Sequence, residues 1–145
     1  MLLNFSDNLD NYKLMRQAII PRPIAWIVTE DKNTNIAPFS YFMALTSTPP
    51  TMVVSIGHKS DGTPKDTLEN IRKTKKCTIC MPKEEQLEQM HFSSKELEHN
   101  MSEADVFDIG LEKKIKNFPP MVKDAPIAFY CELFQELDTD LTHHA

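Results

Sequence analysis

The apolar residues of this chain gather in short runs that polar or proline-containing segments separate. The first run follows Pro21 and Pro23, and over 24–28 it carries apolar side chains at both alternating sets of positions. This pattern predicts a strand that is covered on both faces, with the prolines at its start. The polar turn EDKNTN and a second apolar run over 35–39 follow, so we predict a β-hairpin.

Three later runs, rich in β-branched or aromatic residues, predict further strands. They cover 51–57, 77–81 and 127–133. The polar residues up to Met15 predict a lead-in or a short helix. Short strands with helices only as inserts argue against a doubly wound parallel sheet. We therefore predict a single domain over 1–145 that is mainly β with helical inserts.

Three segments between the strands have other patterns. Segment 65–75 predicts a helix, in which Asp66 and Glu69 have the spacing of a capping box. Segment 82–118 is polar and favours one or two short inserted helices, either a substrate lid or only a cover. Segment 40–50, which ends in two prolines, is interpreted as a connection with room for one helical turn.

Composition excludes several classes of protein. The 145 residues carry a net charge of −5 and no basic stripe, so we expect no nucleic-acid partner. No apolar run approaches the roughly 20 residues that span a bilayer, and the N-terminus lacks the pattern of a signal peptide. We therefore expect a cytoplasmic protein with no membrane partner.

The three cysteines, Cys77, Cys80 and Cys131, are too few and odd in number for a disulfide framework. Cys77 and Cys80 have C-x-x-C spacing, but residues three apart on a strand point to opposite faces. We interpret them as core residues, with a redox or metal pair as the weaker alternative. We predict no metal site, and only three glycines exist, which excludes a G-x-G-x-x-G dinucleotide motif.

The loop between the strand at 51–57 and the helix at 65–75 carries groups that suit a phosphate. Its donors are two lysines and three hydroxyl residues: Lys59, Lys65, Ser60, Thr63 and Thr67. The helix N-terminus adds free N–H groups and the positive end of its dipole. Asp66 would repel a phosphate unless it caps the helix and Lys65 lies between the two. An ordinary solvated strand–loop–helix is the alternative that these residues leave open.

Four segments, in order, resemble the flavin reductase-like family of FMN-binding split barrels. They are IIPRPIAWIVTED, NIAPFSYFMALTSTPP, VVSIG and KDTLENI. The later APIAFYCEL is similar to that family's strand before its C-terminal region, so the resemblance runs from about Ile19 to Leu133. It implies a six-stranded Greek-key split β-barrel with helical inserts, and FMN held near a homodimer interface.

The resemblance also implies where the cofactor binds. Ser40, Tyr41 and Phe42 would follow the isoalloxazine ring, and Ser55, Ile56 and Gly57 would line the same pocket. Lys65, Asp66 and Thr67 would lie at the ribityl phosphate, with Arg22 near it. The family continues after residue 133 with a strand that closes the barrel, so we expect this chain to lack its C-terminal closing strand.

The implied function is an FMN-binding oxidoreductase. It would pass electrons from a reduced donor such as NAD(P)H through FMN to a small acceptor. No catalytic residue is assigned, because the reactive atoms belong to the cofactor. Two alternatives stay open: a non-enzymatic flavin carrier, and a truncated relative that only dimerises.

Overall fold

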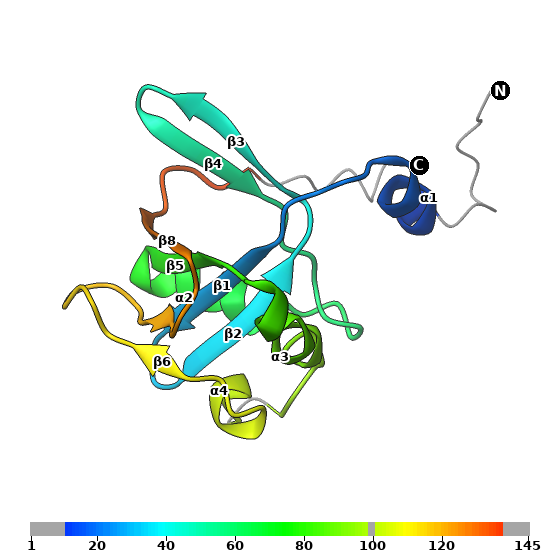
Figure 1. The fold of residues 1–145 in the computed structure, drawn as a ribbon. Coiled ribbons are helices and arrows are strands. Elements are labelled where there is room, and N and C mark those ends of the chain that lie inside the picture. The colour runs from blue at the N-terminus through cyan, green and yellow to red at the C-terminus, as the bar shows by residue number, and fades with distance from the viewer. Residues whose placement is uncertain (1–10, 99–100, 138–145) are drawn as a thin grey trace, which may run out of the picture.

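Strand β1 (Ala25–Glu30) lies inside a four-stranded antiparallel sheet whose order is β2–β1–β5–β8 (Figure 1). The computed structural model describes residues 11–98 and 101–137. The other strands are β2 (Thr34–Phe39), β3 (Phe42–Ser47), β4 (Pro50–Val54), β5 (Lys76–Met81), β6 (Leu111–Glu112), β7 (Met121–Val122) and β8 (Ile127–Glu132). The helices are α1 (Asn11–Ala18), α2 (Asp66–Thr74), α3 (Leu87–Phe92) and α4 (Glu103–Val106), with the 3-10 turn η1 (Glu84–Gln86) before α3.

The predicted hairpin at the start of the chain is confirmed. Strands β1 and β2 pair antiparallel from Ala25 with Phe39 to Glu30 with Thr34. The later strands predicted at 77–81 and 127–133 are also confirmed as β5 and β8, which pair antiparallel along their whole length. Within the described residues, the strand predicted over 51–57 is shorter, since β4 ends at Val54.

Both faces of β1 are covered, as its apolar pattern predicts. Residues 25–29 are fully buried. Trp26 and Val28 belong to one hydrophobic cluster, and Ala25 and Ile27 belong to another on the opposite face. Successive side chains of a strand point to opposite faces, so this one strand supplies both halves of the core.

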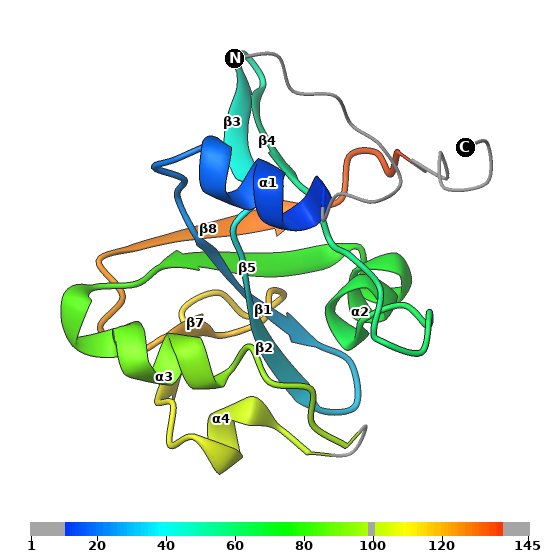
Figure 2. The ribbon, with the colours of Figure 1, turned by 90° about the vertical axis from the view of Figure 1, so that its right-hand side faces the viewer.

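Different parts of the chain cover the two faces. The predicted helical insert supplies α3 and α4, whose Met90 and Ala104 pack with Trp26. Figure 2 shows α3 and α4 together, apart from α2, which packs through Ile71 on the other cluster. Trp26 Nε1 also donates a buried hydrogen bond of 3.0 Å to Ser93 Oγ, just after α3. This part of the insert is therefore a cover of the core.

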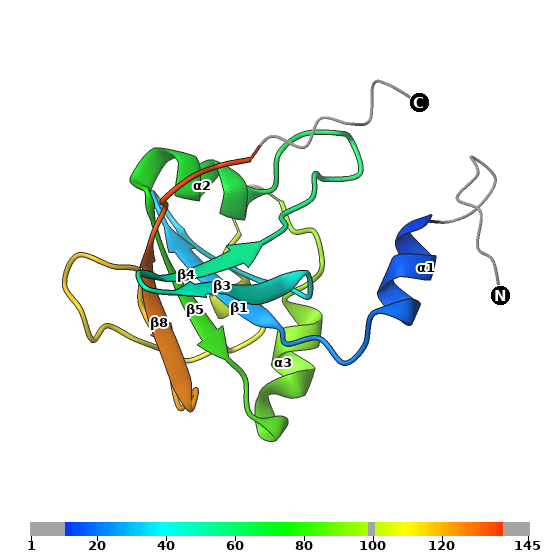
Figure 3. The same cartoon turned by 90° about the horizontal axis from the view of Figure 1, so that it is seen from above.

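The interpretation of segment 40–50 as a connection is wrong. Residues 42–47 form β3, which pairs with β4 from Phe42 with Val54 to Ser47 with Pro50. Figure 3 shows this hairpin crossing the main sheet, on which Phe42 and Val54 pack. All residues of β3 after Phe42 are exposed. Neither face of the strand is buried along its length, so its sequence needs no apolar alternation that would reveal it. Its pairing with β4 defines it.

The short helix that the N-terminal region allowed is α1. It buries none of its residues, and Figures 1 and 3 show it set apart from the sheet. Its described contacts include Tyr12, whose ring centre lies 6.2 Å from that of Tyr41. Among the described helices, none is both long enough and apolar enough to cross a membrane.

Candidate functional site

The N-terminus of α2 lacks a side-chain cap in the described part of the chain. Lys65 is the N-cap residue, in an extended conformation, and no side chain of the described residues forms a capping hydrogen bond there. The condition that Asp66 caps the helix is not met, because Asp66 is already its first residue. The positive end of the helix dipole and the first backbone N–H groups therefore lie beside Lys65 without a side-chain cap.

Asp66 pairs with a lysine from the preceding loop. Lys59 Nζ lies 2.7 Å from Asp66 Oδ1, and both side chains are partly exposed. This hydrogen bond to Asp66 raises the pKa of Lys59. The lysine thus offsets the carboxylate that would otherwise repel an anion at the helix N-terminus. Lys65 is left as the second cation there, with its Nζ 5.9 Å from the centre of the Phe39 ring.

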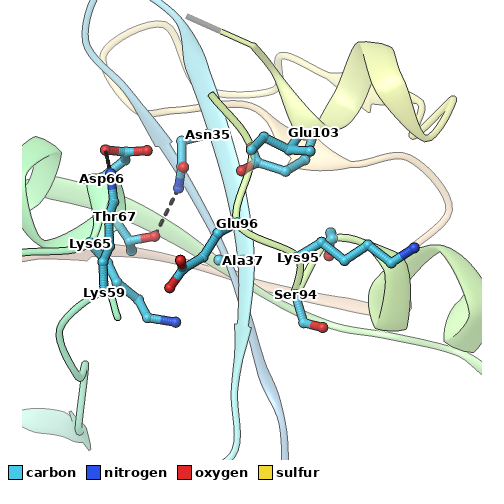
Figure 4. Close-up of a pocket in the computed structure, with 12 residues that line it drawn as sticks. Asn35, Ala37, Lys59, Lys65, Asp66, Thr67, Ser94, Lys95, Glu96 and Glu103 are labelled. Carbon is cyan, nitrogen blue, oxygen red and sulfur yellow. Dashed lines mark hydrogen bonds and ion pairs between the residues drawn. The ribbon is translucent and has the colours of Figure 1, made fainter. Parts of the chain in front are cut away.

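These groups line one pocket. Figure 4 shows Lys59, Lys65, Asp66 and Thr67 on one side, with Ser94, Lys95 and Glu103 across from them. The remaining lining residues are Asn35, Ala37, Ser93, Glu96 and Leu97. Three predicted site residues, Lys65, Asp66 and Thr67, are therefore brought together. All three come from the start of α2, and β2 forms the floor between the two sides.

Thr67 has a different environment from the one its hydroxyl led us to expect. Its side chain is 1% exposed, and its Oγ1 accepts a hydrogen bond of 2.8 Å from Asn35 Nδ2. Asn35 therefore ties the first turn of α2 to β2. The hydroxyl of Thr67 positions the helix N-terminus from within the core.

The far side of the pocket was missed by sequence reasoning. Glu96 accepts hydrogen bonds from the hydroxyl and the backbone N–H of Ser60, at 3.2 and 3.4 Å. Buried Glu103 accepts one of 3.0 Å from the backbone N–H of Ile36. The inserted segment thus closes over the loop before α2. Only its polar, helix-favouring character was visible in the sequence, which does not show what it contacts.

A second group of predicted residues lies where the main sheet meets the β3–β4 hairpin. Ser40 and Tyr41 connect β2 to β3, and the backbone N–H of Ser55 donates a hydrogen bond of 2.9 Å to the carbonyl of Tyr41. Segments 40–42 and 55–57 therefore run side by side. A Cβ at position 57 would meet no atom of the described residues within 4 Å, so the backbone of Gly57 is accessible with respect to this part of the chain.

Phe39 links the two groups. It packs in the cluster that also holds Phe42 and Ile56, while the Lys65 ammonium lies over its ring. This apolar cluster, in which Phe39 is buried and Phe42 and Ile56 are partly buried, therefore adjoins the cationic N-terminus of α2.

Arg22 is placed with Tyr41 and does not line the pocket of Lys65. Its guanidinium carbon lies 5.5 Å from the centre of the Tyr41 ring, and it donates to the carbonyls of Arg16 and Ile19. Arg22 Nε and Tyr41 Oη are both buried with no hydrogen-bond partner in the described part of the chain. Buried polar atoms of this kind normally have a partner, so this pair is a candidate contact for a ligand.

The family model for the flavin reductase-like domain matches residues 15–144. The chain belongs to the flavin reductase-like domain family. An uncharacterised protein of Aquifex aeolicus is 34% identical over 128 residues, which are 86% of this chain and 64% of that protein. This chain therefore spans less than two thirds of that relative's length.

Solved structures of flavin reductase-like proteins share the fold. Component B of nitrilotriacetate monooxygenase from Bacillus cereus matches with a TM-score of 0.84 and 30% identity, over 93% of this chain and 69% of that one. A flavin reductase of Shewanella frigidimarina with a split-barrel domain matches with a TM-score of 0.67 and 26% identity, over 77% and 55%. An FMN-binding domain of a flavin reductase-like enzyme from Shewanella baltica, at 20% identity, shares the fold with a TM-score of 0.70, over 83% and 62%.

The flavin reductase-like fold of this chain agrees with the predicted fold class. It is mainly β with helical inserts and matches split-barrel proteins. In the described sheet, β8 has a partner on one side only, so it ends the order of strands. The expectation of a missing closing strand stays a prediction.

The buried carboxyl group of Glu103 allows a test of how its contact with Ile36 affects stability. Desolvation by burial raises the pKa of this carboxyl group. Because its pKa is raised in the folded state, the protonated carboxyl group of Glu103 contributes stability at low pH. This contribution is lost as pH rises through the folded-state pKa. We expect Glu103→Gln, which keeps an oxygen acceptor for Ile36, to raise the unfolding free energy at neutral pH. The gain in unfolding free energy should shrink at pH values below the ordinary pKa range of glutamate, where the wild-type carboxyl group is uncharged as well.

Chemical denaturation at several pH values measures this effect. The exposed Glu98→Gln variant is the control, and its stability should follow that of the wild type. A Glu103→Gln variant that is less stable than the wild type at neutral pH would show that the charge itself is needed.

Proposed function

We propose that this protein binds FMN, with the phosphate at the N-terminus of α2 and the isoalloxazine ring along segments 40–42 and 55–57. The observation that carries the proposal is the start of α2, where no described side chain caps the helix and Lys65 adjoins the apolar cluster of Phe39, Phe42 and Ile56. FMN combines the same two properties, an anionic phosphate and a flat aromatic ring.

The residues fit the parts of FMN. Helix N-termini with a nearby lysine bind phosphate through backbone N–H groups and charge, and Asp66 is offset here by Lys59. The exposed Ser55 and Gly57 leave backbone accessible beside the ring surface. The buried Tyr41 Oη and Arg22 Nε, which lack partners in the described residues, offer donors at the other end of this surface.

We propose that the activity is oxidoreduction of the flavin reductase type. Bound FMN would supply the electron-accepting ring. The protein would then position the ring, exclude water from one face, and donate backbone N–H groups of 40–42 to the charge that develops on reduction. The electron donor would be a reduced nicotinamide or a similar compound, and the acceptor a small molecule. Membership of the flavin reductase-like family supports this proposal.

A kinetic measurement separates this activity from a carrier role. We expect the protein to oxidise NADH in the presence of FMN faster than free FMN alone does. A protein that binds FMN but adds nothing to the rate with NADH or NADPH would instead be a flavin carrier. Absence of flavin from the absorption spectrum of protein mixed with FMN and desalted would contradict binding itself.

We further propose that the protein is a homodimer through the β3–β4 hairpin. Met43, Leu45 and Val53 of this hairpin are 58%, 62% and 38% exposed. Exposed apolar side chains gathered on one element are typical of an interaction surface. Sedimentation velocity should show a dimer, and Leu45→Glu should shift it to monomer, while Val106→Glu on α4 should not. A wild-type monomer at all concentrations would contradict this part.

Lys65 is the residue for a direct test of the phosphate site. Removing one charge-assisted contact to a phosphate costs about 1.5–3 kcal/mol, so Lys65→Ala should weaken FMN binding by roughly tenfold to a hundredfold. Lys32→Ala, in the exposed turn between β1 and β2, removes the same charge elsewhere and should have little effect. A fluorescence titration of FMN measures both, and equal affinities for the two variants would refute the site.

A further inference from the structure

Two cysteines that lie far apart in the sequence face each other across neighbouring strands. Cys77 of β5 is directly opposite Cys131 of β8 in the antiparallel register. Directly opposite side chains point to the same face, and both cysteines belong to the cluster that contains Ile71 and Ile79. The C-x-x-C partner Cys80 points to the other face, with Trp26. The structure therefore pairs Cys77 with Cys131 and separates it from Cys80.

The backbone places the two thiols within reach of each other. The backbone N–H of Leu133 donates to the carbonyl of Lys75 at 2.8 Å, two positions along both strands from the cysteines. Because pair types alternate along an antiparallel ladder, Cys77 and Cys131 form a hydrogen-bonded pair, with Cα atoms about 5.5 Å apart. Disulfides span Cα separations of about 4.4–6.8 Å, so this pair meets that condition.

The two thiols have unequal environments. Cys77 is 9% exposed, whereas Cys131 is only half-buried. A hydrogen bond with the Cys77 thiol lowers the pKa of Cys131, and the same bond together with burial raises the pKa of Cys77. The reactivity of a cysteine depends on access as well as on its pKa, so the half-buried Cys131, whose Sγ lies 3.6 Å from the Phe129 carbonyl oxygen, is the thiol that an oxidant reaches first.

We propose that Cys77 and Cys131 form a peroxide-sensitive dithiol site, in which Cys131 is oxidised first and Cys77 then closes a reversible cross-strand disulfide. In the first step the Cys131 thiolate attacks hydrogen peroxide, the O–O bond breaks, and a sulfenic acid and hydroxide form. In the second step the Cys77 sulfur attacks the Cys131 sulfur, the S–O bond breaks, and the Cys77 proton leaves with the hydroxyl as water. Two thiols are oxidised and one peroxide is reduced to two waters.

The ladder geometry also indicates what kind of disulfide forms. Opposite Cβ atoms in a sheet lie about 4.5–5.5 Å apart, with hydrogen-bonded pairs toward the longer end, whereas a disulfide needs about 3.5–4.5 Å. Closing the bond must draw β5 and β8 together locally. Strain of this kind makes a disulfide easier to reduce, which is typical of a regulatory bond and not of a structural staple.

Mass spectrometry of the native chain tests this site. Reduced, desalted protein is treated with stoichiometric hydrogen peroxide, alkylated with iodoacetamide and mapped without reduction. We expect a loss of two hydrogen masses, a crosslinked peptide pair containing Cys77 and Cys131, and complete reversal by reduced glutathione without denaturant. The Cys80→Ser variant should behave in the same way, and Cys131→Ser should form no intramolecular disulfide.

Other outcomes overturn the proposal. These are an unchanged mass with Cys131 fully alkylated, addition of oxygen at Cys131 without a crosslink, a crosslink that involves Cys80 or a second chain, and a bond that glutathione reduces only after denaturation. The wild-type peptide map decides between these outcomes even if a cysteine variant fails to fold.

Discussion

The burial of β1 on both faces is the constraint on which the rest of the structure depends. Every side chain over 25–29 is fully buried, so each face of the sheet needs its own cover. The inserted helices α3 and α4 cover the face with Trp26, and α2 with the base of the β3–β4 hairpin covers the face with Ile27. This second cover brings the start of α2 next to Phe39 and close to the junction of the two sheets. The candidate site is thus a result of how the core is closed.

Much of the fold could be predicted because its signals are local. The residues of each signal lie close together in the sequence: the uninterrupted apolar run around Trp26, the polar turn before Asn35 and the helical spacing after Lys65. The strand β3 could not be predicted in this way. Its residues Met43 and Leu45 are exposed, and only the pairing with β4 makes the segment extended.

The candidate site was predictable only in part, for the same reason. The loop with Lys59 and Lys65 has phosphate-binding chemistry that composition alone reveals, while the assignment of FMN depended on family resemblance. The ion pair of Lys59 with Asp66 and the contact of Glu96 with Ser60 join segments by tertiary packing. Likewise, strand alternation correctly separates Cys77 from Cys80, but the register that pairs Cys77 with Cys131 requires the structure.

The proposed function depends on a flavin phosphate that binds beside Lys65 at the N-terminus of α2, where no described side chain caps the helix. Calorimetric titration with FMN and with riboflavin, which lacks the phosphate, tests it most directly. We expect FMN to bind at least roughly tenfold more tightly than riboflavin, since its phosphate gains charge-assisted hydrogen bonds that riboflavin cannot make. Equal affinities for the two flavins, or no binding of either, would contradict it.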